Sequence, residues 1–124
     1  MEISVINIPL NLDMYDVLGN YILYKDLEYS RPMIFNYKTN ERYNIGIRSC
    51  FKALFLINGD IICSKGTEIS IYGEDLKKVV QTKSNLVYLF PSSSFRWKYI
   101  KEGWKPKILN VSKKVKREDL INYE

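Results

Sequence analysis

The sequence predicts an α+β fold, in which one compact domain combines an antiparallel-rich β-sheet with one to three short helices. Several segments alternate apolar and polar residues with the period of two that is typical of strands. The dipeptide Asn58-Gly59, between two apolar runs, is a strong hairpin signal. Two segments, residues 11–20 and 74–83, place their apolar residues at helical spacing instead. Together these patterns favour a sheet with helices packed on it.

Length and composition predict a single domain. The chain has 124 residues, of which 46% are hydrophobic and 27% charged, and this balance is ordinary for a globular protein. No linker, repeat or low-complexity tract divides it. We expect one domain over residues 1–124, with residues 112–124 forming a C-terminal tail that is either helical or mobile.

The first predicted helix covers the sequence NLDMYDVLGN. Asn11 is a suitable N-cap, Asp13 and Asp16 suit the positive end of a helix, and Gly19-Asn20 suits its end. The apolar stripe comprises Leu10, Met14, Val17, Leu18 and Tyr21.

The second predicted helix begins near Glu74 and Asp75 and ends near Lys83, with charges that complement its dipole. Its apolar residues are Leu76, Val79 and Val80. Residues 86–90 are apolar throughout and predict a buried strand after it.

The remaining segments predict strands. Residues 3–8 form a first strand that ends at Pro9, and residues 21–25 form another. Residues 33–38 and 42–47 predict a hairpin. A second hairpin covers Phe51–Ser64, and both of its faces are apolar, which places it in the core.

The two cysteines are expected to be reduced. A two-residue turn at Asn58-Gly59 places Cys63 opposite Leu54, so that Cys50 lies about 13 Å away, beyond the reach of a disulfide. The N-terminus lacks a basic leader, and no apolar run is long enough to span a membrane. The sequence therefore predicts a cytoplasmic protein without a membrane partner.

The absence of histidine narrows the chemistry. The chain has no His and only two Cys, so serine and cysteine triads and the usual zinc sites each lack a member. We expect no catalytic residue, no metal site and no cofactor, and the protein is predicted not to be an enzyme.

The net charge of +5 is unevenly distributed. Residues 1–90 carry ten basic and ten acidic residues, whereas residues 91–117 carry nine basic residues and one acidic residue. Such clustering is typical of a polyanion-binding face. The candidate phosphate-contacting residues are Arg96, Lys98, Lys101, Lys105, Lys107, Lys113, Lys114, Lys116 and Arg117.

Aromatic residues interleave with these cations. If residues 95–100 form a strand, Phe95, Trp97 and Tyr99 point to one side, and Arg96 and Lys98 point to the solvent on the other. We favour inward-facing rings that join the core. The alternative is a platform on which Phe95, Trp97, Tyr99 and Trp104 stack with unpaired bases.

These features lead to two main hypotheses, and a third class, an enzyme that would have to use carboxylates, Lys or Tyr, is disfavoured. The first is a small nucleic-acid-binding accessory protein that contacts phosphates of DNA or RNA through residues 96–117, with strong salt dependence and little base specificity. The alternative is a protein-interaction module, such as a subunit, inhibitor or structural component, that docks through a tyrosine-rich surface. The Ile-, Lys-, Asn- and Tyr-rich composition suggests an AT-rich coding sequence, as in viruses or mobile elements.

Overall fold

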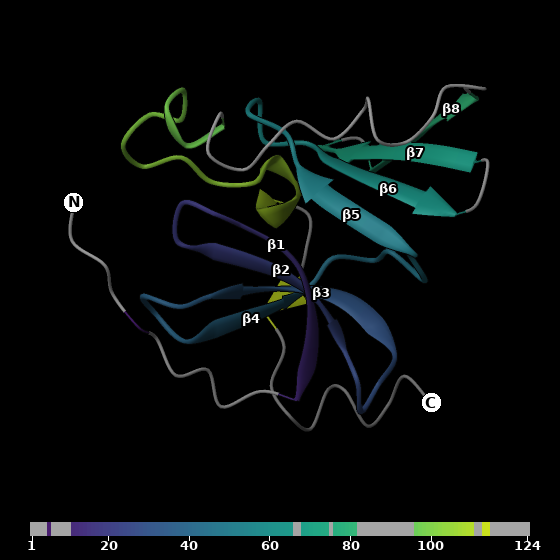
Figure 1. The fold of residues 1–124 in the computed structure, drawn as a ribbon, viewed down its shortest axis with the longest axis horizontal. Coiled ribbons are helices and arrows are strands. Elements are labelled where there is room, and N and C mark those ends of the chain that lie inside the picture. The colour runs from purple at the N-terminus through teal and green to yellow at the C-terminus, as the bar shows by residue number, and fades with distance from the viewer. Residues whose placement is uncertain are drawn as a thin grey trace.

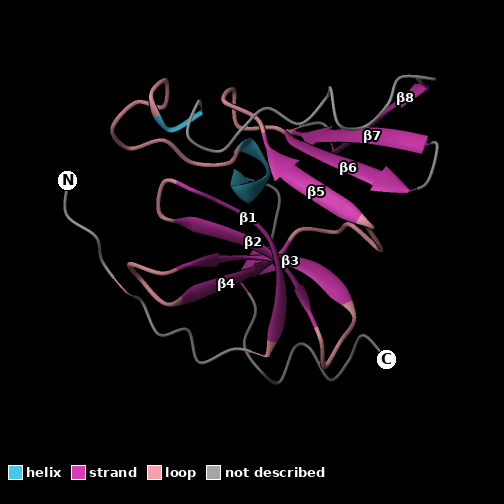
Figure 2. Ribbon diagram, in the orientation of Figure 1, coloured by secondary structure: helices cyan, strands magenta, loops and turns pink. Residues whose placement is uncertain are grey.

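Two antiparallel sheets make up the fold (Figures 1 and 2). The computed structural model describes residues 5, 11–65, 68–74, 76–81, 96–110 and 113–114. The first sheet has the order β1-β2-β3-β4-β9, and the second has the order β5-β6-β7-β8. The strands are β1 (Leu12–Leu18), β2 (Tyr21–Asp26), β3 (Arg31–Asn36), β4 (Glu41–Asn44), β5 (Lys52–Phe55), β6 (Ile61–Lys65), β7 (Glu68–Gly73), β8 (Leu76–Gln81) and β9 (Lys113–Lys114).

The predicted α+β class is wrong, because both predicted helices are strands and the described chain is nearly all β. In place of the first helix, β1 pairs with β2 through a two-residue turn at Gly19-Asn20. Gly19 has a φ of 60°, and glycine at the first central position is the pattern of a type II′ hairpin turn. The dipeptide Gly19-Asn20, predicted to end a helix, equally marks a hairpin.

The second predicted helix is also replaced by a strand. β8 pairs with β7 along its whole length, from Glu68 opposite Gln81 to Gly73 opposite Leu76. Backbone pairing with an existing strand edge outweighs the helical spacing of a segment this short. Lys83, the predicted strand at residues 86–90 and the predicted strand at residues 3–8 lie outside the described residues, apart from Val5.

One predicted strand and two predicted hairpins are confirmed. β2 is the strand predicted at residues 21–25, and β3 and β4 form the hairpin predicted between residues 33 and 47. β5 and β6 form the hairpin predicted over Phe51–Ser64, but its register differs by one residue. The connection is a three-residue loop, residues 57–59, in which Gly59 has a φ of 95°. As a result Cys63 lies opposite Ala53, not Leu54.

Cys50 and Cys63 form a disulfide, with their Cα atoms 5.7 Å apart. The prediction of two reduced thiols is therefore wrong. That prediction assumed a straight strand. In the structure, Lys52 pairs with Ser64 and the Phe51 amide also donates to the carbonyl of Ser64, so two residues lie opposite one. This bulge returns Cys50 to the side of Cys63. Because disulfides persist in oxidising environments, the cysteines no longer support a cytoplasmic location.

The main core contains residues of both sheets. Its buried members are Leu18, Tyr21, Leu23, Ile34, Ile45, Ile47, Cys50, Ala53, Phe55, Ile61, Cys63, Tyr72 and Ile108. Smaller clusters lie on the other face of each sheet, around Tyr24 and around Ile62. Both faces of the β5–β6 hairpin are thus buried, as its apolar pattern predicts. No helix in the described ranges has the length and apolar character needed to cross a membrane.

Removing the disulfide should destabilise the protein. The bond closes a loop with a sequence separation of 13, and a loop of this size stabilises by about 3 kcal/mol. The double variant Cys50→Ala/Cys63→Ala should lose about that much in urea denaturation. Alkylation of the unfolded, unreduced wild-type chain should add no mass; two added labels would contradict the disulfide.

Candidate nucleic-acid interface

Residues 96–110, which we call the covering segment, lie along the open edge of β5. Three carbonyls on this edge and on the following loop accept hydrogen bonds from the segment: Phe55 O from Arg96 Nη1 at 2.8 Å, Ile57 O from Trp104 Nε1 at 2.8 Å, and Gly59 O from the Lys107 amide at 2.9 Å. Only Phe55 belongs to β5, and Ile57 and Gly59 lie in the loop that follows it. The segment therefore satisfies an edge that would otherwise be open to pairing.

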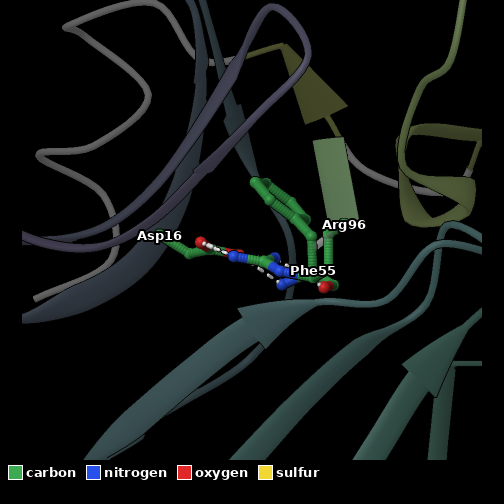
Figure 3. A network of polar contacts seen from close by, with 3 residues as sticks. All are labelled: Asp16, Phe55 and Arg96. Carbon is green, nitrogen blue, oxygen red and sulfur yellow. Dashed lines mark hydrogen bonds and ion pairs between the residues drawn. The ribbon is translucent and has the colours of Figure 1, made fainter. Parts of the chain in front are cut away.

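Arg96 is the deepest contact of the covering segment. Its guanidinium forms two hydrogen bonds with the Asp16 carboxylate, each of 2.5 Å (Figure 3). The same carboxylate accepts the Phe55 amide at 2.8 Å. The side chains of Arg96 and Asp16 are 1% and 3% exposed. Asp16 and Arg96 thus act on Phe55 as a neighbouring strand would, accepting from its N–H and donating to its C=O.

A β-bulge in β1 directs Asp16 into the core. Met14 pairs with Tyr24 and Asp16 pairs with Leu23, which leaves Tyr15 as the extra residue. Asp16 therefore lies on the face of Leu23, inside the main core. Tyr15 packs against the same core and donates to the carbonyl of Cys50 at 2.7 Å. Burial raises the pKa of Tyr15, and the nearby carboxylate of Asp13 raises it further.

Arg96 was predicted to be solvated and to contact phosphate, and this is wrong. Arg96 and Trp97 have helical backbone, and the Tyr99 amide donates to Arg96 O, so the strand alternation assumed for residues 95–100 does not apply. Trp97 is 44% exposed and Tyr99 is 56% exposed. The favoured prediction of inward-facing rings is therefore wrong for these two residues.

Trp104 is a structural residue with a half-buried ring. It makes edge-to-face contacts with Tyr21 and Phe55, at centroid distances of 6.1 Å and 5.5 Å. Gly19 lies against it, because a Cβ at Gly19 would come within 3.0 Å of the Trp104 ring. These contacts fix the Trp104 ring against the main core, whereas Trp97 and Tyr99 are exposed.

The predicted cations have different environments. Lys98, Lys101 and Lys105 are exposed, whereas Lys107 lies 3.5 Å from the Asp60 carboxylate. Lys113 and Lys114 form β9 and pair with Asn44 and Tyr43. Phe95, Lys116 and Arg117 lie outside the described residues, as does most of the predicted tail at residues 112–124.

The structure thus brings together a smaller set than the sequence predicts. Trp97, Lys98, Tyr99, Lys101 and Lys105, which we call the 97–105 face, are all exposed on the covering segment. This part of the chain projects as the green loop at the upper left of Figure 1. The exposed anion Glu102 lies in the same loop, and a turn at Gly103, with a φ of 78°, returns the chain to Trp104.

The predicted tyrosine-rich surface is sparse in the described part of the chain. Of the eight tyrosines described, only Tyr99 is exposed. The others are buried or half-buried, and burial raises the pKa of Tyr43, which also donates to Glu41 at 2.7 Å, to about 12. Across the described residues, no group of three or more Asp, Glu or Cys side chains is placed to hold a metal ion.

Comparison of the chain with protein-family models, with curated proteins and with solved structures finds no match.

Neutralising Asp16 should be strongly destabilising. Asp16→Asn keeps an oxygen for the Phe55 amide but leaves the buried Arg96 charge uncompensated, and breaking a buried pair in this way costs about 3–5 kcal/mol. Asp13→Asn is the matched control, since Asp13 is exposed on the same strand and its loss should change stability by less than about 0.5 kcal/mol. Equal effects of the two variants in urea denaturation would contradict a buried ion pair.

Proposed function

We propose that the protein binds single-stranded nucleic acid through the 97–105 face, without catalysing a reaction. Bases stack on Trp97 and Tyr99, and Lys98, Lys101 and Lys105 contact phosphates. The observation that carries the proposal is that both rings are exposed on the loop that also presents the three lysines. Aromatic rings beside cations are the usual means of binding single strands with little sequence preference.

Two further features support this proposal. The two exposed rings forgo the stabilisation that large aromatic side chains supply when they are buried in a core or an interface. The loop that carries them is held at both ends, by Arg96 on Asp16 and by Trp104 on Ile57. A platform fixed in this way loses little conformational entropy on binding.

Single strands are favoured over duplexes, because stacking on a ring needs a base whose face is open. The phosphate contacts are few: Arg96 and Lys107 face the carboxylates of Asp16 and Asp60, which leaves three exposed lysines on the 97–105 face. We therefore propose modest affinity and a shallow salt dependence, with stacking as the larger contribution.

Fluorescence anisotropy with a labelled 20-nucleotide single strand, at about 50 and 200 mM salt, tests this function. Trp97→Ala should weaken binding by about 1–3 kcal/mol, the usual contribution of one stacked base. Lys98→Gln/Lys101→Gln should reduce the slope of log K against log salt by about 1.4, since each phosphate contact in a single strand contributes about 0.7.

Matched controls use exposed residues elsewhere. Phe51 is 76% exposed, so Phe51→Ala removes an exposed ring without touching the 97–105 face. Lys38→Gln/Lys65→Gln removes two exposed charges from other strands and turns. Both controls should bind like the wild type. If they weaken binding as much as the variants of the face, or if the wild type does not bind at 50 mM salt, the proposal is wrong.

A further inference from the structure

The loop that joins β5 to β6 contains the only Asn-Gly pair of the chain, Asn58-Gly59. Asn-Gly pairs are prone to spontaneous deamidation, because glycine has no side chain to keep its amide nitrogen away from the asparagine side chain. Asn58 is exposed in the loop, and Gly59 has a φ of 95°. The loop is therefore a candidate site of chemical modification.

Hydrogen bonds occupy both groups that deamidation requires. The Asn58 side-chain nitrogen donates to Asp60 Oδ2 at 3.1 Å, and Asn58 Oδ1 accepts the Asp60 amide at 3.0 Å. The Gly59 amide, which is the nucleophile in deamidation, donates to the carbonyl of Leu56 at 2.9 Å. Deamidation therefore requires a local opening of the loop, of the kind that surface loops undergo far more readily than core strands.

Asp60 holds this loop against the second sheet. Its carboxylate lies against β7, where a Cβ at Gly73 would come within 2.6 Å of Asp60 Oδ1. Lys107 Nζ, from the covering segment, lies 3.5 Å from the same oxygen, and the Asp60 side chain is only 20% exposed. The carboxylate that binds the Asn58 side chain is thus itself fixed on two sides.

The same loop also holds the covering segment. Ile57 O accepts the indole N–H of Trp104, and Gly59 O accepts the amide of Lys107. The packing is close, because a Cβ at Gly59 would come within 3.0 Å of Lys107 Cγ and 3.2 Å of Lys105 O. A change of charge or backbone length within this loop therefore acts directly on the covering segment.

We propose that Asn58 is a deamidation site that Asp60 holds closed, and that its conversion loosens the covering segment. In the open loop the Gly59 nitrogen attacks Cγ of Asn58 and forms a succinimide. The bond from Cγ to the side-chain nitrogen breaks, and this nitrogen leaves with the Gly59 proton as ammonia. Water then opens the succinimide to aspartate or isoaspartate, each with a new carboxylate.

The product disturbs the loop in two ways. The new carboxylate faces that of Asp60 without the hydrogen-bond donor that the Asn58 amide supplied, and two carboxylates this close repel each other. The isoaspartate form also lengthens the backbone between Ile57 and Gly59, whose carbonyls hold Trp104 and Lys107. The inference does not depend on the proposed nucleic-acid function, and its tests contain no nucleic acid.

Mass spectrometry tests the modification. The full chain is incubated at mildly alkaline pH, and the tryptic peptide of residues 53–65 is followed over time after reduction and alkylation. In the folded wild type Asn58 should convert, whereas Asn40, which is also exposed in a turn but precedes Glu41, should stay intact. Asp60→Ala should speed the conversion about tenfold, since losing one ordinary hydrogen bond changes an opening equilibrium by about that factor.

Two controls separate the effect of Asp60 on the folded loop from other effects. Asp13→Ala removes an exposed carboxylate from β1 and should convert like the wild type. In urea, where the loop contacts are lost, Asp60→Ala and the wild type should convert at the same rate. The proposal is overturned if Asn58 stays intact in the folded chain while the unfolded chain converts, if Asn40 converts as fast, or if Asp60→Ala changes nothing in the folded chain.

Hydrogen exchange tests the effect on the covering segment. Asn58→Asp reproduces the aspartate product and should speed exchange at the Trp104 indole and the Lys107 amide by about two- to fivefold, as expected for a charge interaction at a partly exposed site. Asn40→Asp is the control, because it adds the same charge to an exposed turn of the first sheet. Unchanged exchange in Asn58→Asp, or an equal change in Asn40→Asp, would overturn the link to the covering segment.

Discussion

The buried pair of Asp16 and Arg96 holds the described structure together. It joins β1 of the first sheet, β5 of the second and the covering segment through one carboxylate, one guanidinium and the backbone N–H and C=O of Phe55. Neither charge can be left alone in the core, because the desolvation of an unpaired ion costs several kcal/mol. The pair therefore requires all three segments to be in place at once.

That constraint determines which side chains meet the solvent. Because Arg96 points into the core from a helical turn, its neighbour Trp97 points outward, and Tyr99 does so two residues later. Trp104 then returns the chain to the core, against Tyr21 and Phe55. The exposed rings and lysines between these two anchors follow from the anchoring itself. A surface of this kind combines an exposed aromatic pair with a small positive charge.

Local sequence signals predicted a good part of the sheet structure. The strands at residues 21–25 and 33–47 and the hairpin over Phe51–Ser64 have clear alternation and turn residues, and all are present. The predictions were wrong where one local pattern fits two different structures. Gly19-Asn20 can end a helix or form a hairpin turn, and Leu76, Val79 and Val80 fit both a helical stripe and a strand. In each case, pairing with a neighbouring strand decides between helix and strand, and a local pattern does not encode that pairing.

The site was harder to predict, because it depends on long-range contacts. Asp16 and Arg96 are 80 residues apart, and nothing in either local sequence marks them as partners. One signal was available: an aspartate between Tyr15 and Val17 in an apolar segment, with no cap role once the segment is a strand. The disulfide likewise depends on the one-residue register shift in the β5–β6 hairpin and on the bulge at Phe51. A register change of one residue alters every cross-strand neighbour.

Hydrogen exchange at the Phe55 amide tests the central claim most directly. On the open edge of β5 this amide has no backbone partner among the described strands, and its protection depends on the Asp16 carboxylate at 2.8 Å. If the buried pair organises the fold, Phe55 should exchange as slowly as Leu56, whose amide is bonded to Asp60 O within the hairpin. Exchange at Phe55 close to the rate of an unprotected amide would show that Asp16 and Arg96 do not hold this edge.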